Sequence, residues 1–179
     1  MTHHPYAGLL RRAAAYLLDV TLLAIAVQVS QWGLRLLAGE ALPPLTTGPQ
    51  IEFFVLLTVS LPIWLYFSVS ESTTGQTLGK RWLSLRVTRE TGDRPHFGRA
   101  LLRTVIKLLP WELTHLTLLL PTPIWSDPQP GFRWGFVAVY ALLGLYAACI
   151  ALTPRKQGLH DLLARTFVLR TRVPQTVPA

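Results

Sequence analysis

The chain of 179 residues is 50% apolar and only 15% charged, and its 17 lysines and arginines against 9 acidic residues leave a net charge of +8. This composition argues against a disordered chain, which needs more polar residues, and the single Cys149 argues against a disulfide scaffold. So few charges also fit poorly with a DNA-binding domain, despite the basic pI of 10.4. We therefore expect one integral membrane domain whose partner is the bilayer and not nucleic acid.

Three windows are long and apolar enough to cross a bilayer, which takes roughly 20 helical residues. They cover 13–31, 53–70 and 134–152, and the only charge inside them is Asp19. Soluble core helices are the alternative, but three of them in this length leave too little polar sequence to cover them. The first window continues past its signal-peptide-like Ala24–Ala26 site, which favours a retained helix over a cleaved leader.

The segment 107–125 is ambiguous because Lys107, Glu112 and His115 also suit an amphipathic helix in the interface. Basic residues of short loops collect on the cytoplasmic side of a membrane. Two of them precede the first window, eight lie in residues 71–107, and five follow the last window. All three groups can be cytoplasmic only if the ambiguous segment also crosses. We predict four spans with both termini in the cytoplasm.

The cytoplasmic loop 71–106 and the cytoplasmic tail 153–179 each hold a short strand-like stretch. Residues 83–87 alternate apolar and polar side chains at a period of two, and 166–170 are comparable. These stretches predict a small cytoplasmic sheet. The expected fold is an all-α polytopic membrane protein with about four transmembrane helices and a small cytoplasmic β element, in a single domain.

Three stretches of the chain carry a family resemblance. They are AGLLRRAAAYLLDVTLL (7–23), TTGQTLGKRWLSLRVTRETGDRPHFGRALLR (73–103) and GLHDLLARTFVLR (158–170). In this order and spacing they resemble the RDD family of bacterial inner-membrane proteins. The arginine and the two aspartates for which that family is named match Arg12, Asp19 and Asp161. The resemblance implies a bacterial inner-membrane protein with a suspected transport role, and some members are proposed cation/proton antiporters.

Asp19 lies about 10 Å along the first predicted helix, where a charged side chain costs roughly 2.5–3.5 kcal/mol and needs a partner, water or a proton. Arg12, two helical turns earlier, lies on the same face. A structural ion pair, a proton or cation site, and an anionic ligand held by the arginines all remain open. Other cationic partners expected from the same leaflet are Lys80, Arg81, Arg103 and Lys107.

Asp161, which follows His160, fits three arrangements: a cap on a helix over 162–165, a pair with a loop arginine, or one cluster with Arg12 and Asp19. Glu112 and His115 share a helical face and suit a proton relay at depth, or are simply solvated if the segment is interfacial.

The segment 75–81 has the wrong glycine spacing for a phosphate-binding loop. We predict a turn there, with Lys80 and Arg81 meeting phospholipid phosphates.

The last window carries a stripe of small side chains, which favours close helix packing inside the fold or in a homo-oligomer. Its members are Ala141, Gly144, Ala148 and Ala151. The sequence shows no catalytic arrangement, cofactor motif or metal-ligand spacing, so we expect neither an enzyme nor a cofactor. Two hypotheses remain: a transport-related protein that uses the Arg12, Asp19 and Asp161 cluster, and a non-transporting module whose basic face binds anionic lipid or a partner protein.

Overall fold

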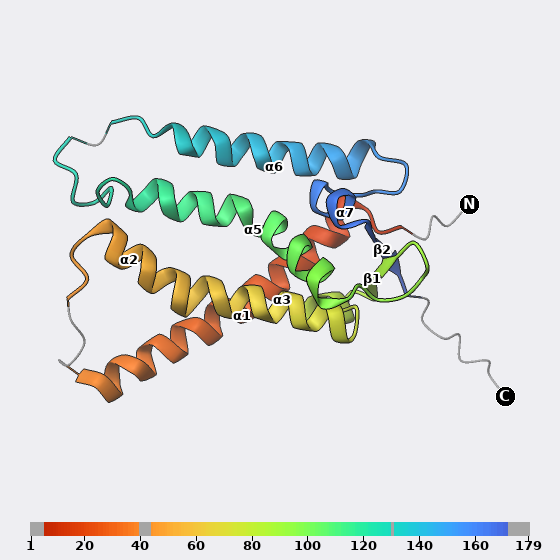
Figure 1. Cartoon of the computed structure of the whole chain (residues 1–179), viewed down its shortest axis with the longest axis horizontal. Helices are drawn as coiled ribbons and strands as arrows, with labels where there is room; N and C mark the ends of the chain where they lie inside the picture. Colours follow the sequence, from red (N-terminus) through yellow and green to blue (C-terminus); the bar gives the residue numbers. More distant parts are fainter. Residues whose placement is uncertain (1–5, 40–43, 130, 172–179) are drawn as a thin grey trace.

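The computed structural model describes residues 6–39, 44–129 and 131–171. Long helices lie side by side along the long axis of the molecule, and short helices and a two-stranded sheet gather at one end (Figure 1). We call this end the sheet end, and the end that holds the α1–α2 and α5–α6 connections the loop end. The long helices are α1 (Leu9–Ala38), α2 (Gly48–Val55) continued by α3 (Leu61–Thr73), α5 (Phe97–Leu119) and α6 (Trp134–Leu152).

Three helices in the described part of the chain are long and apolar enough to cross a membrane. They are Leu9–Ala38, Gly48–Thr73 and Trp134–Leu152. The three apolar spans predicted from the sequence are therefore confirmed. The first two helices extend beyond the predicted windows at both ends, and the third matches its window.

The helix α5 is as long as a span, with 23 residues, and runs antiparallel to α6 (Figure 1). Because α5 carries several charged side chains, it is not among the three helices that are apolar enough to cross a membrane. The predicted fourth crossing therefore stays a prediction. The predicted segment 107–125 is shifted relative to the observed helix. The helix begins where the His96 side chain accepts a hydrogen bond from the Arg99 N–H at 3.4 Å. It ends before Pro121 and Pro123, which cannot continue a helix.

Prolines inside the long helices are accommodated by local adjustments. Pro110 lacks an N–H, so it leaves the Ile106 carbonyl without its helical donor. The Tyr146 hydroxyl on α6 donates a hydrogen bond to that carbonyl and so joins the two helices. A π-helical turn, Leu56–Ser60, comes just before Pro62. Membrane helices tolerate prolines through such changes in local winding.

The predicted sheet is present. Strands β1 (Leu85–Arg89) and β2 (Thr166–Arg170) pair antiparallel, with Val87 opposite Val168. The inward face of the sheet packs on the first turns of α1. The buried residues of this small core are Ala7, Ala15, Leu85, Val87 and Val168.

Two short helices connect the sheet to the long helices. The first, α4 (Leu78–Trp82), packs on α1. Its Lys80 is buried and its Arg81 is exposed, and the contact of the two side chains with phospholipid phosphates stays a prediction. The second, α7 (Leu159–Ala164), begins before the helix expected over 162–165 and contains Asp161 within its first turn.

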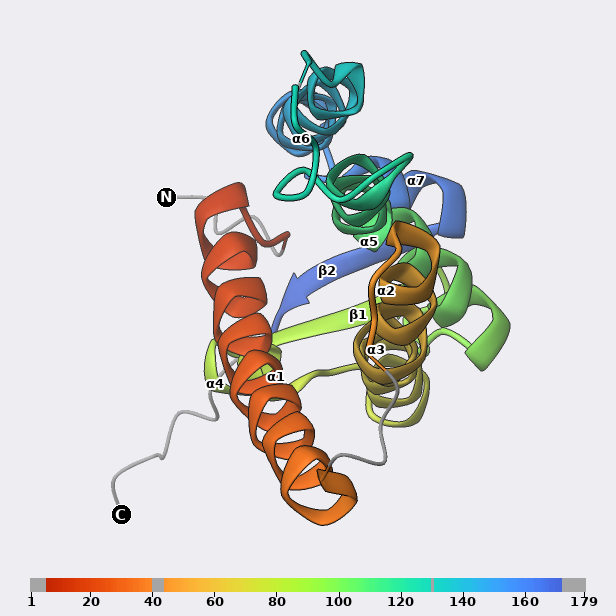
Figure 2. The same ribbon diagram turned by 90° about the vertical axis from the view of Figure 1, so that its left-hand side faces the viewer.

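The outer face of α6 does not pack within the chain. All four small residues of the predicted stripe are exposed, and a side chain added at Gly144 would meet nothing within 4 Å. Viewed along the bundle, α1 stands on one side and the α5–α6 pair on the other (Figure 2). Because α1 packs mainly on α4 and only lightly on α6, this arrangement leaves room between α1 and α6.

Candidate functional site

Asp161 forms ion pairs with two arginines that come from different helices. Its carboxylate lies 2.7 Å from Arg12 Nη1 and 3.0 Å from Arg103 Nη2. It also accepts a hydrogen bond from the Gly158 N–H at 3.0 Å. Burial alone would raise the pKa of Asp161, but Arg103, His160 and Arg12 outweigh burial and hold that pKa well below its usual range. Asp161 is therefore a charged anchor that joins α7 to α1 and α5.

Glu71, at the end of α3, holds a second group of cations. Arg103 Nε lies 3.2 Å from its carboxylate and Lys107 Nζ 3.7 Å, and Lys80 Nζ forms an ion pair with it. Arg103 thus bridges Glu71 and Asp161. The carboxylates of both residues are fully buried. One continuous network therefore connects α1, α3, α4, α5 and α7.

Asp19 is buried but lies outside this ion-pair network. It accepts hydrogen bonds from the Tyr66 hydroxyl at 2.7 Å, the Thr77 hydroxyl at 2.5 Å and the Gly79 N–H at 2.8 Å. A Cβ at position 79 would lie 2.2 Å from the Ala15 carbonyl oxygen, so only glycine lets α4 approach α1 this closely. Both oxygens of the Asp19 carboxylate are thus occupied by neutral donors.

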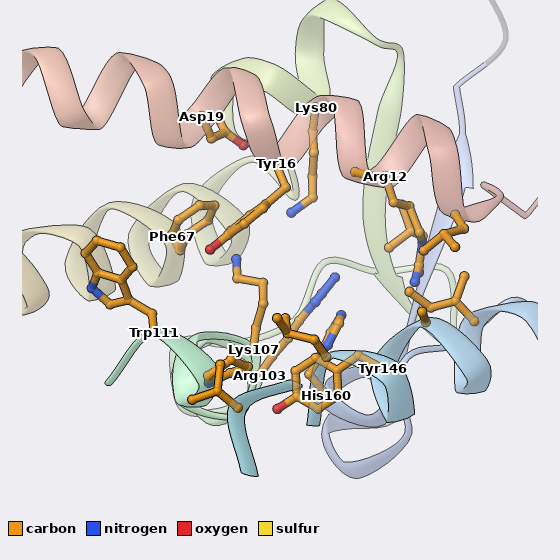
Figure 3. A pocket seen from close by; sticks show the side chains of 18 of the residues that line it. Arg12, Tyr16, Asp19, Phe67, Lys80, Arg103, Lys107, Trp111, Tyr146 and His160 are labelled. Atoms are coloured by element: carbon orange, nitrogen blue, oxygen red, sulfur yellow. The ribbon is translucent and has the colours of Figure 1, made fainter. Parts of the chain in front are cut away.

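A cavity of about 390 Å³ lies between α1, α5 and α6 beside this network (Figure 3). One wall is apolar and comes largely from α1 and α6. Basic side chains and Asp19 line part of the remainder, together with aromatic side chains that include Tyr16, Phe67, Trp111 and Tyr146. The apolar wall includes Leu9, Ala13, Val139, Leu143, Ala147 and Ile150, and the cationic lining consists of Arg12, Lys80, Arg103 and Lys107.

Several buried nitrogen atoms of the basic residues that line the cavity make no hydrogen bond within the described residues, although Arg103 Nε and Lys107 Nζ lie within ion-pair range of Glu71. They are Nε and Nη2 of Arg12, Nε and Nη1 of Arg103, and Nζ of Lys107. The Lys107 ammonium also lies 3.2 Å from the centroid of the Phe67 ring. Buried donors are normally satisfied by protein or by a bound molecule. The cavity therefore offers unused donors to an anion.

His160 adds no charge to this site. Burial, helped by Arg103, Arg12 and Lys107, lowers its pKa to about 3 despite the opposing effect of Asp161. Its neutral ring packs edge-on against Tyr146, with ring centroids 5.6 Å apart. His160 thus serves as a neutral wall of the cavity.

The predicted residues fall into separate groups. The structure joins Arg12 to Asp161, adds Lys80, Arg103 and Lys107 through Glu71, and gives Asp19 its own donors. The predicted accessory residue Arg81 is exposed.

Glu112 and His115 lie away from this site, toward the loop end. The Glu112 carboxylate accepts hydrogen bonds from Ser60 and Trp64, both at 3.0 Å.

The sequence analysis missed Glu71, although it is central to the network. One signal was available: Glu71 is the first charge after an uncharged apolar window and faces the most basic loop of the chain. Glu52 was missed as well. It precedes the same window and pairs in space with residues about 60 positions later in the sequence.

The apolar helices and their connections define an integral membrane protein with several helices. The profile of the RDD family matches residues 6–165, and the chain therefore belongs to the RDD family. The matched region contains the network, the cavity and the three residues Arg12, Asp19 and Asp161. Among curated proteins and solved structures, no match was found.

Proposed function

We propose that this protein binds an anionic amphiphile, a lipid-like molecule with a singly charged phosphate headgroup, in the cavity between α1 and α6. The observation that carries the proposal is the set of nitrogen donors of Arg12, Arg103 and Lys107 that make no hydrogen bond, beside an apolar wall. If the protein transports, such a ligand is its substrate. If the protein does not transport, the ligand is its anchor.

The charge of the site supports a single anionic headgroup. The site contains four cations, Arg12, Lys80, Arg103 and Lys107, which pair with Glu71 and Asp161, and a third carboxylate, Asp19, which pairs with none of them. Four cations against three anions leave one positive charge, because His160 is neutral. An unpaired buried charge is costly. One phosphodiester would neutralise it and accept hydrogen bonds from the arginines.

The shape of the site supports an apolar tail on that headgroup. The volume of about 390 Å³ is within the usual range for small-molecule pockets. Leu143 and Ala147 of α6 and Leu9 and Ala13 of α1 continue the apolar wall toward the outer surface of the bundle. A tail would leave the cavity between these helices and enter the bilayer directly.

The orientation follows from the distribution of charge. The sheet end holds the basic segments that we assign to the cytoplasmic side, and β2 and the bridge from Tyr6 to Leu169 keep both ends of the described chain there. We place the protein in the inner membrane of a bacterium with both termini cytoplasmic and α5 as a fourth span. The headgroup would then come from the cytoplasmic leaflet.

Native mass spectrometry of the purified protein with phosphatidylglycerol or phosphatidylcholine tests the proposal. We expect retention of one phosphatidylglycerol per chain and little retention of phosphatidylcholine. The variant Lys107→Gln should weaken retention, and Ala147→Trp should block it by filling the cavity. Matched controls are Lys156→Gln, outside the site, and Ala148→Trp, on the outer face of the same helix.

Equal retention in the variants and their controls would show that the lipid does not occupy this cavity. Glycerol phosphate, which has the same charged group without tails, should not compete with the lipid. If it binds as tightly, the ligand is a soluble anion and the lipid assignment is wrong.

A second candidate is proton or cation transport through Asp19. It rests on one observation: within the described residues, Asp19 is 1% exposed and has no lysine, arginine or histidine within 4 Å. Proton flux into proteoliposomes compares the native chain with Asp19→Asn, using Asp93→Asn as the exposed control. Loss of flux only in Asp19→Asn would favour this candidate, and unchanged flux would remove Asp19 from any transport step.

A further inference from the structure

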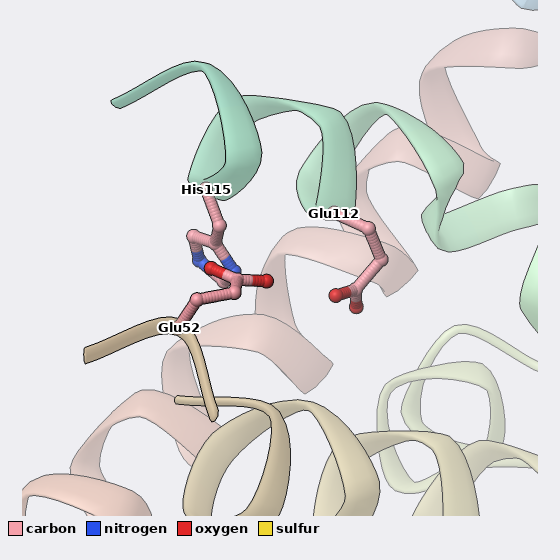
Figure 4. Close-up of side chains that lie close together, drawn as sticks. All are labelled: Glu52, Glu112 and His115. Carbon is pink, nitrogen blue, oxygen red and sulfur yellow. The ribbon is translucent and has the colours of Figure 1, made fainter. Parts of the chain in front are cut away.

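A second group of ionisable side chains lies toward the loop end, beside the part of the cavity that Trp111 and Thr114 of α5 line. Glu52 comes from the first turns of α2, and Glu112 and His115 come from the last turns of α5. One ligand atom from each of the three residues lies within 4.8 Å of the other two. In Figure 4 the Glu52 carboxylate and the His115 ring face each other, and Glu112 points toward the same space.

The backbone brings these residues together at a close helix crossing. A Cβ at Gly48 would lie 2.0 Å from the Leu119 carbonyl oxygen, so α2 and α5 nearly touch at this end. Because Glu52 lies one turn after Gly48, and His115 one turn before Leu119, the crossing places their side chains opposite each other. The proximity is therefore built into the fold.

Neighbouring side chains hold Glu112 and His115 in position. Ser60, the last residue of the π-helical turn, donates a hydrogen bond to Glu112 at 3.0 Å, and the Trp64 indole donates another at 3.0 Å. The Trp111 ring packs edge-on against His115 at 4.4 Å between centroids. Such outer contacts orient the ligands in protein metal sites. π-Helical turns are also frequent at functional sites.

Two atoms of the group have no partner in the described structure. They are Oε2 of Glu52 and Nδ1 of His115, and both are buried. Glu52 is only 7% exposed, so bulk water does not satisfy its carboxylate. A buried carboxylate oxygen and a buried imidazole nitrogen that lack partners are the atoms a metal ion would bind.

The negative charge of the two carboxylates in this group also favours a bound cation. Across the described ranges, no lysine or arginine side chain lies within 4 Å of Glu52 or Glu112. Two carboxylates this close in an apolar environment cannot both remain charged without a neutralising partner. A divalent cation would compensate both at once, and one shared proton would compensate only in part.

We infer that Glu52, Glu112 and His115 form a binding site for one divalent transition-metal ion of the zinc type. A site with two carboxylates and an imidazole suits Zn²⁺ or Co²⁺ better than Mg²⁺ or Ca²⁺, which prefer oxygen ligands alone. Three protein ligands leave a coordination position for water or a further ligand. The site lies about one helical turn from the loops, so a metal ion would enter from the side of the membrane opposite the sheet.

Metal titration of the purified, metal-stripped full-length protein tests this inference. The background variant His3→Ala, His4→Ala removes two histidines that are adjacent in the sequence, so that any metal bound there does not add to the titration. We expect one Zn²⁺ per chain and, with Co²⁺, the visible absorption bands of a site with nitrogen and oxygen ligands. Glu52→Gln and His115→Asn should each weaken Zn²⁺ binding by on the order of 100-fold, and Ser60→Ala by about tenfold, as for an outer contact.

The control variants Glu90→Gln and His96→Asn remove an exposed carboxylate and an exposed imidazole and should bind Zn²⁺ as the background does. Glu52→Gln replaces an oxygen that has no partner, so the variant should keep its thermal stability, and a loss of binding then reports the site itself. Absence of stoichiometric binding, or equal binding in Glu52→Gln and Glu90→Gln, overturns the inference. An infrared band of a protonated carboxyl group that disappears in Glu52→Gln would show that a proton occupies the site instead. Because no cavity residue is changed, the outcome is independent of lipid binding.

Discussion

The two clusters of buried ionisable side chains in this protein have opposite charge balances. At the sheet end, Glu71 and Asp161 are surrounded by cations that exceed them in number. Near the loop end, Glu52 and Glu112 share one histidine and have no basic neighbour within the described residues. One region has an excess of positive charge and the other an excess of negative charge. The comparison teaches that the two regions differ in the sign of their excess charge, and our two proposals assign to each a ligand of opposite sign.

The most disruptive test of this comparison is Asp161→Asn, which removes an anion from the cation-rich region. Arg12 and Arg103 would lose their shared partner while remaining buried, and breaking such a pair costs about 3–5 kcal/mol. We expect a large fall in the thermal unfolding midpoint in detergent and a low yield of folded protein. The exposed Asp93→Asn should change the midpoint little, and an equal effect of both variants would contradict an anchoring role for Asp161.

A smaller effect is expected from Gly79→Ala, which leaves every charge in place and changes only the approach of α4 to α1. The new methyl group would collide with the Ala15 carbonyl and displace the N–H that binds Asp19. We expect a loss of about 1–3 kcal/mol in the free energy of unfolding. Gly33→Ala, in open space on α1, should be neutral or slightly stabilising. Equal stability of the two variants would rule out a tight contact at Gly79.

The effect that is smallest over any single pH unit comes through His160, because it is spread over several pH units. Its pKa is lowered to about 3 in the folded chain, against about 6.5 when unfolded, so the unfolded chain takes up the proton first. Its contribution to stability is complete above pH 6.5 and is lost as the pH falls toward 3, by at most about 1.4 kcal/mol per pH unit. Thermal unfolding of His160→Gln should show a weaker pH dependence in this window, and His96→Asn the native one. Identical pH profiles of thermal unfolding for the native chain and both variants would show that His160 is exposed to solvent and not buried.

Much of the fold followed from local pattern. Apolar windows predicted three long helices, the period of two at 83–87 predicted β1, and three sequence stretches predicted the family. The ends of α5 were less predictable, because a capping histidine and two prolines fix them rather than hydrophobicity.

The partners inside the site could not be read from the sequence in the same way. Lys80 looks like a surface lysine in sequence, and only the packing of α4 on α1 brings it to Glu71. The pairing of Glu52 with His115 likewise depends on the close crossing at Gly48. The members of the second contact are far apart in the chain, and the first contact, across nine positions, depends on how α4 packs and not on a local pattern.

The sequence by itself determined that this chain is a membrane protein of the RDD family, because hydropathy and motif order are local properties. Only the tertiary structure determined which charged side chains form ion pairs with each other. Arg12 and Asp161 are 149 positions apart and become an ion pair through the packing of α7 on α5 and the pairing of β1 with β2. Asp19, the one charge inside the predicted apolar windows, is bound by neutral donors because α4 returns to α1 beside it. A buried charge is stabilised by the nearest group in space, and the sequence does not specify that distance.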